Sequence, residues 1–253
     1  MKISVITTCY NREHSIASAL ESYIAQDYPN KEYVIIDGNS KDQSMEVISR
    51  YKDHIDVLVS EPDTGIYNAL NKGIKNCTGE VIGLLHSDDF FYDEHTLSKI
   101  AECFEKSGAD IVYANGMYVD ENDTSKVKRI YPAKPFEKKY LKWGWIPLHT
   151  TIFAKAEVFE KYGLYREDYR IASDYDISLR WFLNPNLKKE FLDAYVVKMR
   201  LGGKSTDMQQ QKRKSSEDLQ IIREHHLWGK VTLFFKIARK IPQYIIPKIK
   251  KYT

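Results

Sequence analysis

Two aspartates stand side by side in the stretch GLLHSDDFF, residues 83–91. They follow an apolar run that is typical of a buried strand. Because adjacent carboxylates repel each other and are costly to bury without a counter-ion, Asp88 and Asp89 predict a site that binds positive charge. Identifying the cation requires knowing which other residues the fold brings to the same place.

The first 115 residues alternate between strand and helix patterns, which predicts an α/β fold. Such alternation is typical of a mostly parallel, Rossmann-like sheet with helices on both faces. Residues 1–115 are therefore expected to form a doubly wound, nucleotide-binding half. Strands are expected at 3–7, 33–37, 56–60, 81–86 and 110–116, and helices at 15–26, 42–51, 66–76 and 94–108, the last one closed by Gly108.

Polar or aromatic residues follow four successive strands of this half. In open parallel sheets, ligands bind beyond the carboxyl ends of the strands. A single Asp at a strand end is usually a turn former or a helix cap, but four such ends on one edge favour a binding site. The residues concerned are Thr8 and Tyr10, then Asp37, then Asp63, and finally Asp88 and Asp89.

The first strand is followed by TTCYNRE, which lacks the GxGxxG pattern of a dinucleotide site, and a Walker loop is also absent. A diphosphate bound at this edge would therefore need another source of positive charge. A divalent Mg²⁺ or Mn²⁺ ion held by a carboxylate supplies it, since both ions prefer oxygen ligands. We expect Asp89 to bind the metal and the metal to bind the diphosphate.

The second half is less regular. A hairpin is expected at 116–132, a strand leading into a short helix at 150–163, a helix at 173–183, a strand at 190–201 and a helix at 213–228. We expect residues 1–228 to form one domain whose part 116–228 binds the acceptor, followed by a tail at 229–253. The glycine-containing stretch RLGGKST, 200–206, is either a hinged loop that closes over a diphosphate with Arg200, Lys204 and Ser205, or a plain turn.

The tail combines apolar and basic residues. Residues 230–253 contain seven Lys and Arg and no acid, so of the total charge of +3 the rest of the chain carries −4. Helical spacing up to Pro242 places Val231, Phe234, Phe235, Ala238 and Ile241 on one side and Lys236, Arg239 and Lys240 on the other, with Pro242 and Pro247 expected to break the helix. This pattern predicts either an interfacial anchor on an anionic membrane or a helix packed on the domain with solvated lysines.

Composition narrows the class of protein further. The 43% apolar and 29% charged residues are ordinary for a globular chain, and its charge distribution is not that of a nucleic-acid binder. The three cysteines are scattered, which indicates a reducing compartment and argues against a Cys-ligated zinc site. With no signal-peptide pattern and no apolar run of spanning length, we expect a cytoplasmic protein that associates peripherally with the inner face of the membrane.

Four stretches, in this order, resemble glycosyltransferase family 2 of the inverting GT-A fold. They are ISVITTCYNR, IIDGNSKDQS, EPDTGIYNALNKGIKNCTGEVIGLLHSDDFF and ASDYDISLRW, and the resemblance covers about residues 1–205. It implies transfer of a sugar from a nucleotide-diphosphate sugar, with UDP as the expected nucleotide. It also implies that the acceptor is a glycan or a lipid-diphosphate-linked oligosaccharide, as in bacterial surface-polysaccharide assembly.

The resemblance assigns roles to individual positions. Thr8 and Tyr10 would pack against the base, Asp37 would hydrogen-bond the base or ribose, and Asp63 and Lys72 would border the nucleotide. Ser87-Asp88-Asp89 matches the family's DXD position, with Asp88 at the ribose or donor sugar, Asp89 at the metal, and Ser87 in place of the first acid. The second of two frequent acids in IIDGNS is Gly38, which leaves open which group reads the base.

Asp174 falls at the position of the family's catalytic base. Inversion needs one base to deprotonate the acceptor hydroxyl as it attacks the anomeric carbon. The alternative is that Asp174 caps the helix 175–183. Asp176, two residues on, would face elsewhere.

His149 matches a histidine often found near the donor diphosphate, where it would bind metal or phosphate. The alternative is a structural role, which is more common for a single His. His86 is a weaker candidate for the same site.

Two other functions compete with a sugar transferase. A sugar-1-phosphate nucleotidylyltransferase shares the strand order, but it usually carries a glycine- and arginine-rich loop after the first strand, which is absent here. A nucleotide-sugar-binding protein without activity is the other, and the presence of both Asp89 and Asp174 argues against it.

Overall fold

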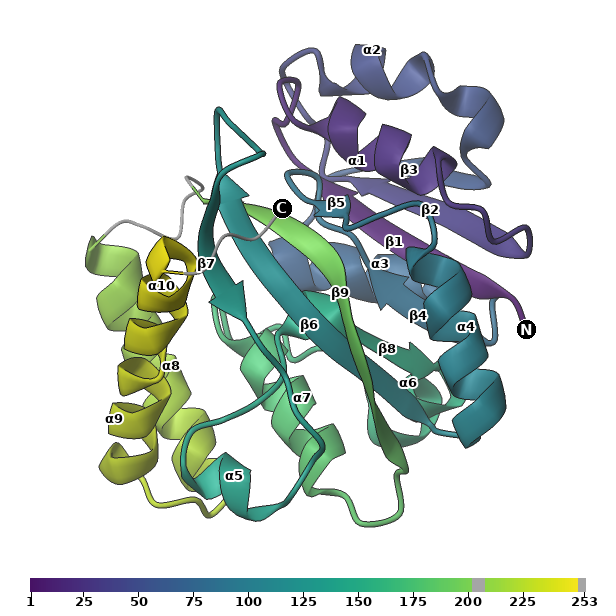
Figure 1. Cartoon of the computed structure of the whole chain (residues 1–253). Coiled ribbons are helices and arrows are strands. Elements are labelled where there is room, and N and C mark those ends of the chain that lie inside the picture. Colours follow the sequence, from purple (N-terminus) through teal and green to yellow (C-terminus); the bar gives the residue numbers. More distant parts are fainter. Residues whose placement is uncertain (202–207, 250–253) are drawn as a thin grey trace.

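The computed structural model describes residues 1–201 and 208–249, and its centre is one nine-stranded mixed sheet (Figure 1). The order is β3-β2-β1-β4-β8-β6-β9-β5, with β7 paired to β6. The strands are β1 (Ile3–Cys9), β2 (Lys31–Asp37), β3 (Val57–Ser60), β4 (Val81–Leu84), β5 (Phe90–Phe91), β6 (Ile111–Asp120), β7 (Val127–Tyr131), β8 (Ile152–Lys155) and β9 (Lys189–Leu201).

The helices of the described residues cover both faces of this sheet. They are α1 (Ile16–Ile24), α2 (Ser44–Ser49), α3 (Ile66–Asn76), α4 (Thr96–Ser107), α5 (Lys139–Lys142), α6 (Ala156–Tyr162), α7 (Ser173–Leu183), α8 (Met208–Glu224), α9 (Lys230–Ala238) and α10 (Lys240–Ile249). Short 3₁₀ turns lie at Lys52–His54 and His149–Thr151. None of the helices in the ranges 1–201 and 208–249 combines the length and apolar character that a membrane span requires.

The parallel half of the sheet follows from its apolar periodicity. β1 pairs in parallel with both β2 and β4, and β2 pairs with β3. Along β2, Tyr33 and Ile35 belong to the core under α1 and α4, while Val34 and Ile36 belong to the core under α3 and α7. Because each strand is buried on both faces, its sequence is apolar throughout rather than alternating. Each such side chain contributes about 1.5–3 kcal/mol by its burial.

Beyond β4 the sheet becomes mixed. β8 runs antiparallel to β4 and β6, while β9 runs parallel to β6 over most of its length. The predicted hairpin at 116–132 is present as β6 and β7, and Gly108 ends α4 with a φ of 62° in the left-handed region, as predicted. The two-residue strand β5 and the one-turn helix α5 were not predicted, because neither is long enough to show a period.

The C-terminal helices depart from the prediction in one respect. The break expected at Pro242 is wrong: α9 ends at Ala238, α10 begins at Lys240, and Pro242 lies in the first turn of α10. A proline is tolerated there because the first N–H groups of a helix have no intrahelical acceptor. The break expected at Pro247 is also wrong, because Pro247 lies inside α10, which continues to Ile249.

The tail packs on the domain through its polar side. Lys236 Nζ forms an ion pair of 2.6 Å with Asp218 of α8, and Arg239 Nε donates to the Trp143 carbonyl at 3.0 Å. Gly144 (φ 68°) lets the chain approach α9 closely: a Cβ there would lie 2.4 Å from the Lys236 backbone nitrogen. Figure 1 shows α8, α9 and α10 grouped at one side of the sheet, with α10 beside β7.

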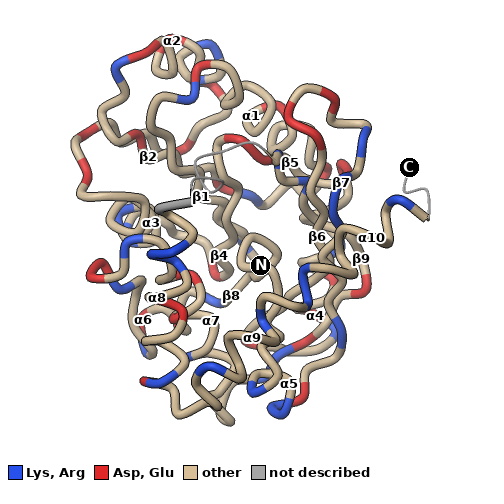
Figure 2. The backbone as a smooth tube through the Cα atoms, turned by 90° about the vertical axis from the view of Figure 1, so that its left-hand side faces the viewer, with Lys and Arg blue, Asp and Glu red and all other residues tan. Residues whose placement is uncertain are grey.

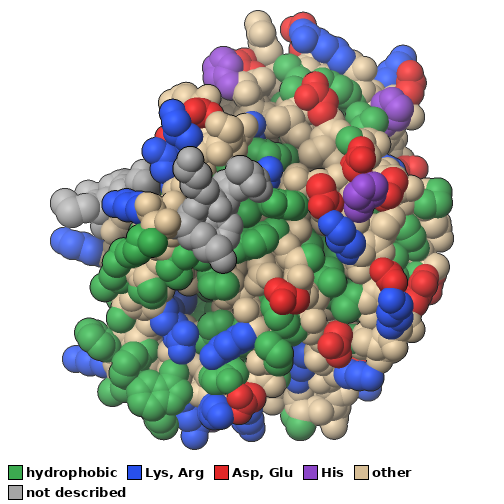
Figure 3. All heavy atoms as spheres, viewed as in Figure 1, with side chains coloured by type: hydrophobic (Ala, Val, Ile, Leu, Met, Phe, Trp, Pro, Cys, Tyr) green, Lys and Arg blue, Asp and Glu red, His purple; other side chains and the backbone are tan. Residues whose placement is uncertain are grey.

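The apolar side of the tail faces outward. Phe234 is 64% exposed and Ile241 61% exposed, and Trp143 joins them with its ring packed edge-on against Trp228. Figure 3 shows hydrophobic side chains gathered on the side where Figure 1 places α9 and α10, with Lys and Arg at the edge. We call this surface the outer apolar face; it consists of Trp143, Trp228, Val231, Phe234, Ile237, Ile241, Ile245 and Ile249.

Candidate active site

The strand order places the predicted residues along one edge. Since β3, β2, β1 and β4 are neighbours and run in parallel, their carboxyl ends lie in a row. The loops after β1 and β2 are joined by backbone-to-side-chain hydrogen bonds: Asn11 N donates to Ser40 Oγ at 2.9 Å, and Lys41 N donates to Asn11 Oδ1 at 2.8 Å. Asn11 adopts a φ of 53° to do so. Thr8 is almost fully buried in the last part of β1, which ends at Cys9, and the exposed Tyr10 comes next.

Asp37 is fully buried at the end of β2, and its carboxylate is hydrogen-bonded to neighbouring serines of the protein. Its carboxylate accepts from the Ser40 amide at 3.1 Å, from the Ser40 hydroxyl, and from Ser60 Oγ at 2.7 Å. The carboxylate therefore holds the β2 loop against the end of β3. The predicted contact with base or ribose stays a prediction, and the geometry favours a positioning role instead.

Gly38, the position where an acid is frequent in related proteins, makes room for Asp63. A Cβ at Gly38 would lie 2.3 Å from Asp63 Oδ2 and 3.4 Å from the ring of Tyr10. Asp63 also accepts a hydrogen bond from the Gly65 amide at 2.9 Å, which fixes the turn before α3. The small residue thus brings a carboxylate and an exposed aromatic ring together at the edge, where a base and its ribose could bind. Lys72, predicted to border the nucleotide, pairs with Glu61 at 2.7 Å.

Asp88 and Asp89 follow β4 at the same edge but differ in environment. Asp88 is half-buried, and its carbonyl accepts a hydrogen bond from Arg200 of β9 at 2.7 Å. Asp89 is only 1% exposed, and no donor among the described residues forms a hydrogen bond with its Oδ2. Burial and the neighbouring Asp88 charge raise the pKa of Asp89 well above its usual value, although the charges of Arg200 and Arg12 oppose the shift.

A divalent metal fits this carboxylate. A buried acceptor oxygen without a donor is costly, and a bound cation would satisfy it. Within residues 1–201 and 208–249, no three His, Cys, Asp or Glu side chains converge to hold a metal by themselves. Mg²⁺-type sites use one or two carboxylates and complete their coordination with substrate phosphates and water.

Asp174 lies in the first turn of α7, and its environment keeps it charged. Tyr67 of α3 donates its hydroxyl to Asp174 Oδ1 at 3.3 Å. Although burial alone would raise the pKa of Asp174, the charges of Lys214, His149 and Lys236 lower it below its usual value. The positive end of the helix dipole acts in the same direction. A half-buried carboxylate that remains ionised is suited to accept a proton.

The cap alternative for Asp174 is not what the structure has. The N-cap residue of α7 is Ala172, which has no side-chain acceptor, and Glu217 of α8 binds the backbone that leads into the helix. The Glu217 carboxylate accepts from the amides of Arg170, Ile171 and Ala172 at 3.2, 2.9 and 3.0 Å. The side chain of Asp174 is thereby left available for chemistry.

Asp176 faces away from this site, as predicted. It is buried and bonded to Arg180 Nε at 2.9 Å and to His225 Nε2 at 3.1 Å. Its role is therefore to hold α7 against α8, which keeps the first turn of α7 in place.

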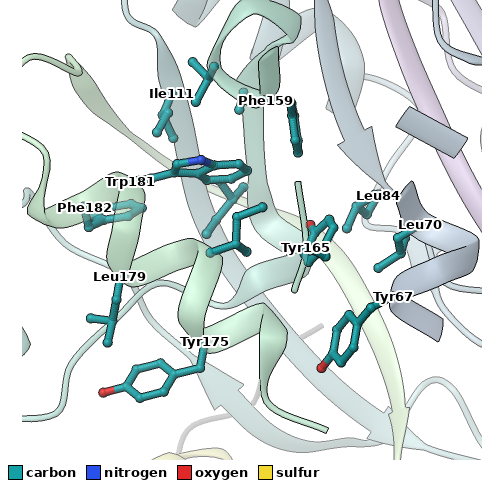
Figure 4. Close-up of a cluster of buried hydrophobic side chains, with 14 of the residues drawn as sticks. Tyr67, Leu70, Leu84, Ile111, Phe159, Tyr165, Tyr175, Leu179, Trp181 and Phe182 are labelled. Carbon is teal, nitrogen blue, oxygen red and sulfur yellow. The ribbon is translucent and has the colours of Figure 1, made fainter. Parts of the chain in front are cut away.

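His149 lies beside Asp174, but it has a different partner from the one predicted. Its Nε2 is 2.6 Å from the Tyr165 hydroxyl, and Tyr165 stacks on Tyr67 (Figure 4). Burial lowers the pKa of His149 to about 4, so the ring is neutral at pH 7. The role of His149 in binding metal or phosphate stays a prediction. Its contacts favour a role in positioning Tyr165 and, through it, Tyr67, which bonds to Asp174.

The aspartates after β4 and Asp174 of α7 act on the same neighbouring side chains. The charges of Asp88 and Asp174 both act on His86, whose pKa is lowered by burial against their effect. The charges of Asp89 and Asp174 both act on the hydroxyl of Tyr118 in β6, whose pKa is raised to about 12 chiefly by burial. Asp88, Asp89 and Asp174 are therefore close enough to influence the same side chains.

Several residues of this site were not predicted, namely Tyr67, Lys214, Glu217 and Lys236. Tyr67 stands in the quoted stretch EPDTGIYNAL, but nothing in the sequence connects it with residue 174. The other three come from α8 and α9, and only tertiary packing brings them here. Lys204 and Ser205, expected in a closing loop, lie outside the described residues.

Solved structures identify the class of fold. Staphylococcus aureus TarS, residues 1–349 in complex with UDP-GlcNAc, superposes with a TM-score of 0.71 at 19% identity over 99% of this chain and 77% of that one. The mannosyltransferase PcManGT of Pyrobaculum calidifontis, in complex with GDP-Man and Mn²⁺, gives a TM-score of 0.67 at 16% identity over 100% and 76%. The fold is thus α/β of the GT-A type, with a mostly parallel mixed sheet.

The sequence comparison identifies the family. Residues 4–163 match the model for glycosyl transferase family 2, and the chain belongs to this family. A glycosyltransferase of Rickettsia typhi described as uncharacterized is 27% identical over 77% of this chain and 62% of its own length. The PGL/p-HBAD biosynthesis glycosyltransferase of Mycobacterium tuberculosis is 26% identical over 77% and 75%. The chain spans about 60% of the length of the rickettsial relatives that it matches.

Proposed function

We propose that this chain transfers a sugar from a nucleotide-diphosphate sugar to a hydroxyl group of a glycan or lipid-linked oligosaccharide, with inversion at the anomeric carbon. The observation that carries the proposal is that two carboxylates have opposite environments. Asp89 is buried after β4 with an oxygen that has no hydrogen-bond partner among the described residues, and nearby positive charge lowers the pKa of Asp174 in the first turn of α7. Membership of glycosyl transferase family 2 supports the reaction class.

The donor nucleotide binds along the strand ends. Tyr10 is free to pack on the base, and the Asp63 carboxylate, held close by Gly38, is placed to accept a hydrogen bond from base or ribose. Thr8 and Lys72 border the same edge, and Asp88 approaches the ribose or donor sugar. We expect uracil as the base: TarS was solved with UDP and UDP-GlcNAc, although PcManGT was solved with GDP-Man, so guanine is the alternative.

Asp89 would hold the metal, Mn²⁺ or Mg²⁺. When bound, such an ion neutralises the charge that develops on the leaving diphosphate. The orphaned oxygen of Asp89 and the oxygen-only chemistry of the pair fit this ion, and PcManGT was solved with Mn²⁺. Arg200 and Arg12, whose charges act on Asp89, limit the repulsion between the two neighbouring carboxylates.

Asp174 would act as the general base. It takes the proton from the acceptor hydroxyl while that oxygen attacks the anomeric carbon from the side opposite the diphosphate, which inverts the configuration. The Tyr67 hydroxyl and the bonds of Glu217 to the backbone before α7 fix the position of the carboxylate, and the charges of Lys214 and Lys236 keep it ionised at neutral pH.

Nucleotide binding measured by thermal shift tests the donor site. UDP and GDP, each with and without Mn²⁺, are added to the full chain, to Asp89→Ala and to a control, Asp53→Ala, whose carboxylate is exposed on the turn before β3. A nucleotide at 100 times its Kd adds about 2.7 kcal/mol of stability. We expect a Mn²⁺-dependent shift for wild type and Asp53→Ala that Asp89→Ala loses. A shift of equal size in all three proteins would contradict the metal assignment.

Sugar transfer itself separates the remaining alternatives. A nucleotidylyltransferase would consume a nucleoside triphosphate and release pyrophosphate, whereas a transferase releases UDP or GDP from the sugar donor. Slow hydrolysis of a UDP-sugar with Mn²⁺, in the absence of acceptor, is the expected result. A protein that binds the donor tightly but releases no nucleotide with any acceptor mixture would instead be a binding protein.

We also propose that residues 230–253 attach the protein to an anionic membrane surface, on the cytoplasmic side where nucleotide sugars are made. Two observations favour this: the outer apolar face points away from the domain, and the tube from Lys230 to the end of α10 carries basic but no acidic residues (Figure 2). Exposed lysines surround the face, namely Lys138, Lys139, Lys142, Lys230, Lys240 and Lys248. An anionic leaflet would bind both the apolar residues and the lysines.

A further inference from the structure

Asn71 of α3 is a buried amide whose nitrogen and oxygen are both hydrogen-bonded. It is 4% exposed, and its side chain exchanges two bonds with the backbone of Tyr165: Nδ2 donates to the Tyr165 carbonyl at 2.9 Å, and Oδ1 accepts from the Tyr165 amide at 3.0 Å. The same Nδ2 donates to Glu167 Oε1 at 2.9 Å. Because an apolar side chain could fill this position without needing any partner, the amide is suited to fixing a geometry rather than to filling the core.

The segment between α6 and α7 is held from two sides. Asn68, one turn before Asn71, donates to Glu167 Oε2 at 3.0 Å, so both oxygens of this carboxylate are bonded to α3. From the other side, Arg180 of α7 donates to the Leu164 carbonyl at 2.6 Å. α3 belongs to the half of the chain that carries the proposed donor edge, so these bonds join that half to the half that carries the proposed base.

Tyr165 extends this series of contacts to the proposed base. Its ring stacks on that of Tyr67, with the centroids 5.8 Å apart and an interplanar angle of 16° (Figure 4), and its hydroxyl lies 2.6 Å from His149 Nε2. Tyr67 in turn donates its hydroxyl to Asp174 Oδ1 at 3.3 Å. A continuous series of contacts therefore runs from Asn71 through the two tyrosine rings to Asp174.

We propose that Asn71 is a positioning residue for the transfer reaction and acts on the general base Asp174 through the two stacked tyrosines. This inference rests on the proposed function. The bonds of Asn71 fix the backbone of Tyr165, and the ring of Tyr165 limits where the Tyr67 ring can lie. A misplacement of about 1 Å can lower the rate of an enzyme by about 100-fold, so a residue remote from the reacting atoms can still control kcat.

Turnover of a UDP-sugar with Mn²⁺ measures the effect of Asn71→Ala. The variant removes both bonds to the Tyr165 backbone, so we expect kcat to fall by about 10- to 100-fold while UDP affinity stays unchanged. Asn76→Ala, the same substitution at an exposed position of α3, is the matched control and should keep both values. If the alanine variant does not fold, Asn71→Asp decides: it keeps the size of the side chain but loses the donor to the Tyr165 carbonyl, and it should show the same split between kcat and UDP affinity.

A double-mutant cycle with Tyr67→Phe shows whether Asn71 acts through the stacked rings. Phenylalanine keeps the stacking but lacks the hydroxyl that bonds to Asp174. We therefore expect Asn71→Ala to lower kcat by less than about threefold in the Tyr67→Phe background, because the contact that it disturbs is already absent. A purely structural role of Asn71 would lower kcat by the same factor in both backgrounds and would overturn the proposal.

The outcomes separate this inference from the proposed function. If wild type releases no nucleotide from a UDP-sugar or a GDP-sugar, the proposed function is contradicted, and this inference with it. If wild type turns over and Asn71→Ala has the same kcat at a temperature where both are folded, this inference is overturned and the transferase assignment stands. A parallel loss of UDP affinity in Asn71→Ala would make Asn71 a residue of the donor site, which would also overturn its action on the base.

Discussion

Asp174 and Asp89 are chemically the same residue, but their surroundings shift their pKa values in opposite directions. Burial and Asp88 raise the pKa of Asp89, which therefore needs a cation to be charged, whereas nearby cations lower the pKa of Asp174 and keep it ionised without one. Such a difference between two carboxylates is the usual sign of divided roles in an active site. The prediction for each variant differs accordingly.

Asp174→Asn removes the proton acceptor while keeping the size of the side chain. We expect kcat to fall by roughly 10²–10⁴, the range for loss of a general base, with UDP affinity unchanged. The control is Asp168→Asn, an exposed acid in the same half that pairs with Arg166. Equal losses in kcat and in UDP affinity would instead make Asp174 a residue of the donor site.

Gly38→Ala tests the nucleotide edge. The added Cβ would meet Asp63 Oδ2 at 2.3 Å and displace it from Tyr10, so we expect UDP affinity to fall roughly three- to tenfold, the value of one hydrogen bond. Gly108→Ala is the matched control: it strains the left-handed end of α4, costing about 1 kcal/mol of stability, but lies away from the edge. Unchanged UDP affinity in Gly38→Ala would remove Asp63 from the donor site.

The elements of the first half could be predicted because their signals are local. Apolar runs and helical spacing located β1, β2, α3 and α4 to within a few residues, and their alternation predicted a mostly parallel sheet. The acidic strand ends could therefore be assigned to one edge. Asp37 shows the limit of this reasoning: its position was predicted, but not that Ser40 and Ser60 occupy its oxygens.

Residues of α8 help to set the environment of Asp174, the proposed general base, and the sequence could not reveal this. Lys214, Glu217 and Asp218 share one face of that helix at spacings of three and four residues, and Ile221 and Ile222 continue the face into the core. A polar stripe at helical spacing is ordinarily a solvated surface. Here it faces α7 and α9, and only long-range packing determines that.

Glu217→Gln tests this element. The uncharged amide is a weaker acceptor for the three amides before α7, so we expect stability to fall by about 1–2 kcal/mol and kcat to fall with UDP affinity unchanged. Glu160→Gln, which makes the same change at an exposed position of α6, is the control. A kcat equal to wild type at a temperature where Glu217→Gln is fully folded would show that the α7 cap is dispensable for catalysis.

The candidate sites follow one another in a fixed order across the whole molecule. The proposed donor edge lies at the carboxyl ends of β1 to β4, and the proposed general base, Asp174, lies in the first turn of α7. The outer apolar face lies on the exposed side of α9 and α10. A donor would thus arrive from solution and an acceptor from a membrane.

The tail was expected to be amphipathic, but its orientation could not be predicted. A helix of this composition can pack its apolar side on the domain or expose it, and the choice depends on what the domain offers. Here Asp218, the Trp143 carbonyl and Gly144 receive the polar side, so the apolar side is left outward. An exposed patch of this kind on a folded chain marks an interaction surface.

Co-sedimentation with vesicles tests the membrane role of this surface. Wild type should pellet with vesicles containing phosphatidylglycerol and not with phosphatidylcholine alone, because each lysine near an anionic surface adds about 1 kcal/mol of attraction, and raising the salt should release it. Phe234→Asp and Ile241→Asp place a charge on the outer apolar face without touching its docked side, so each should leave the protein in the supernatant and its melting temperature unchanged. Leu58→Asp, at a 41% exposed apolar position on edge strand β3, is the matched control and should still pellet. Pelleting of both tail variants, or equal binding to neutral vesicles, would mean that the outer apolar face binds something other than an anionic leaflet. If wild type forms a concentration-dependent dimer that Phe234→Asp abolishes, the partner of this face is a second copy of the chain.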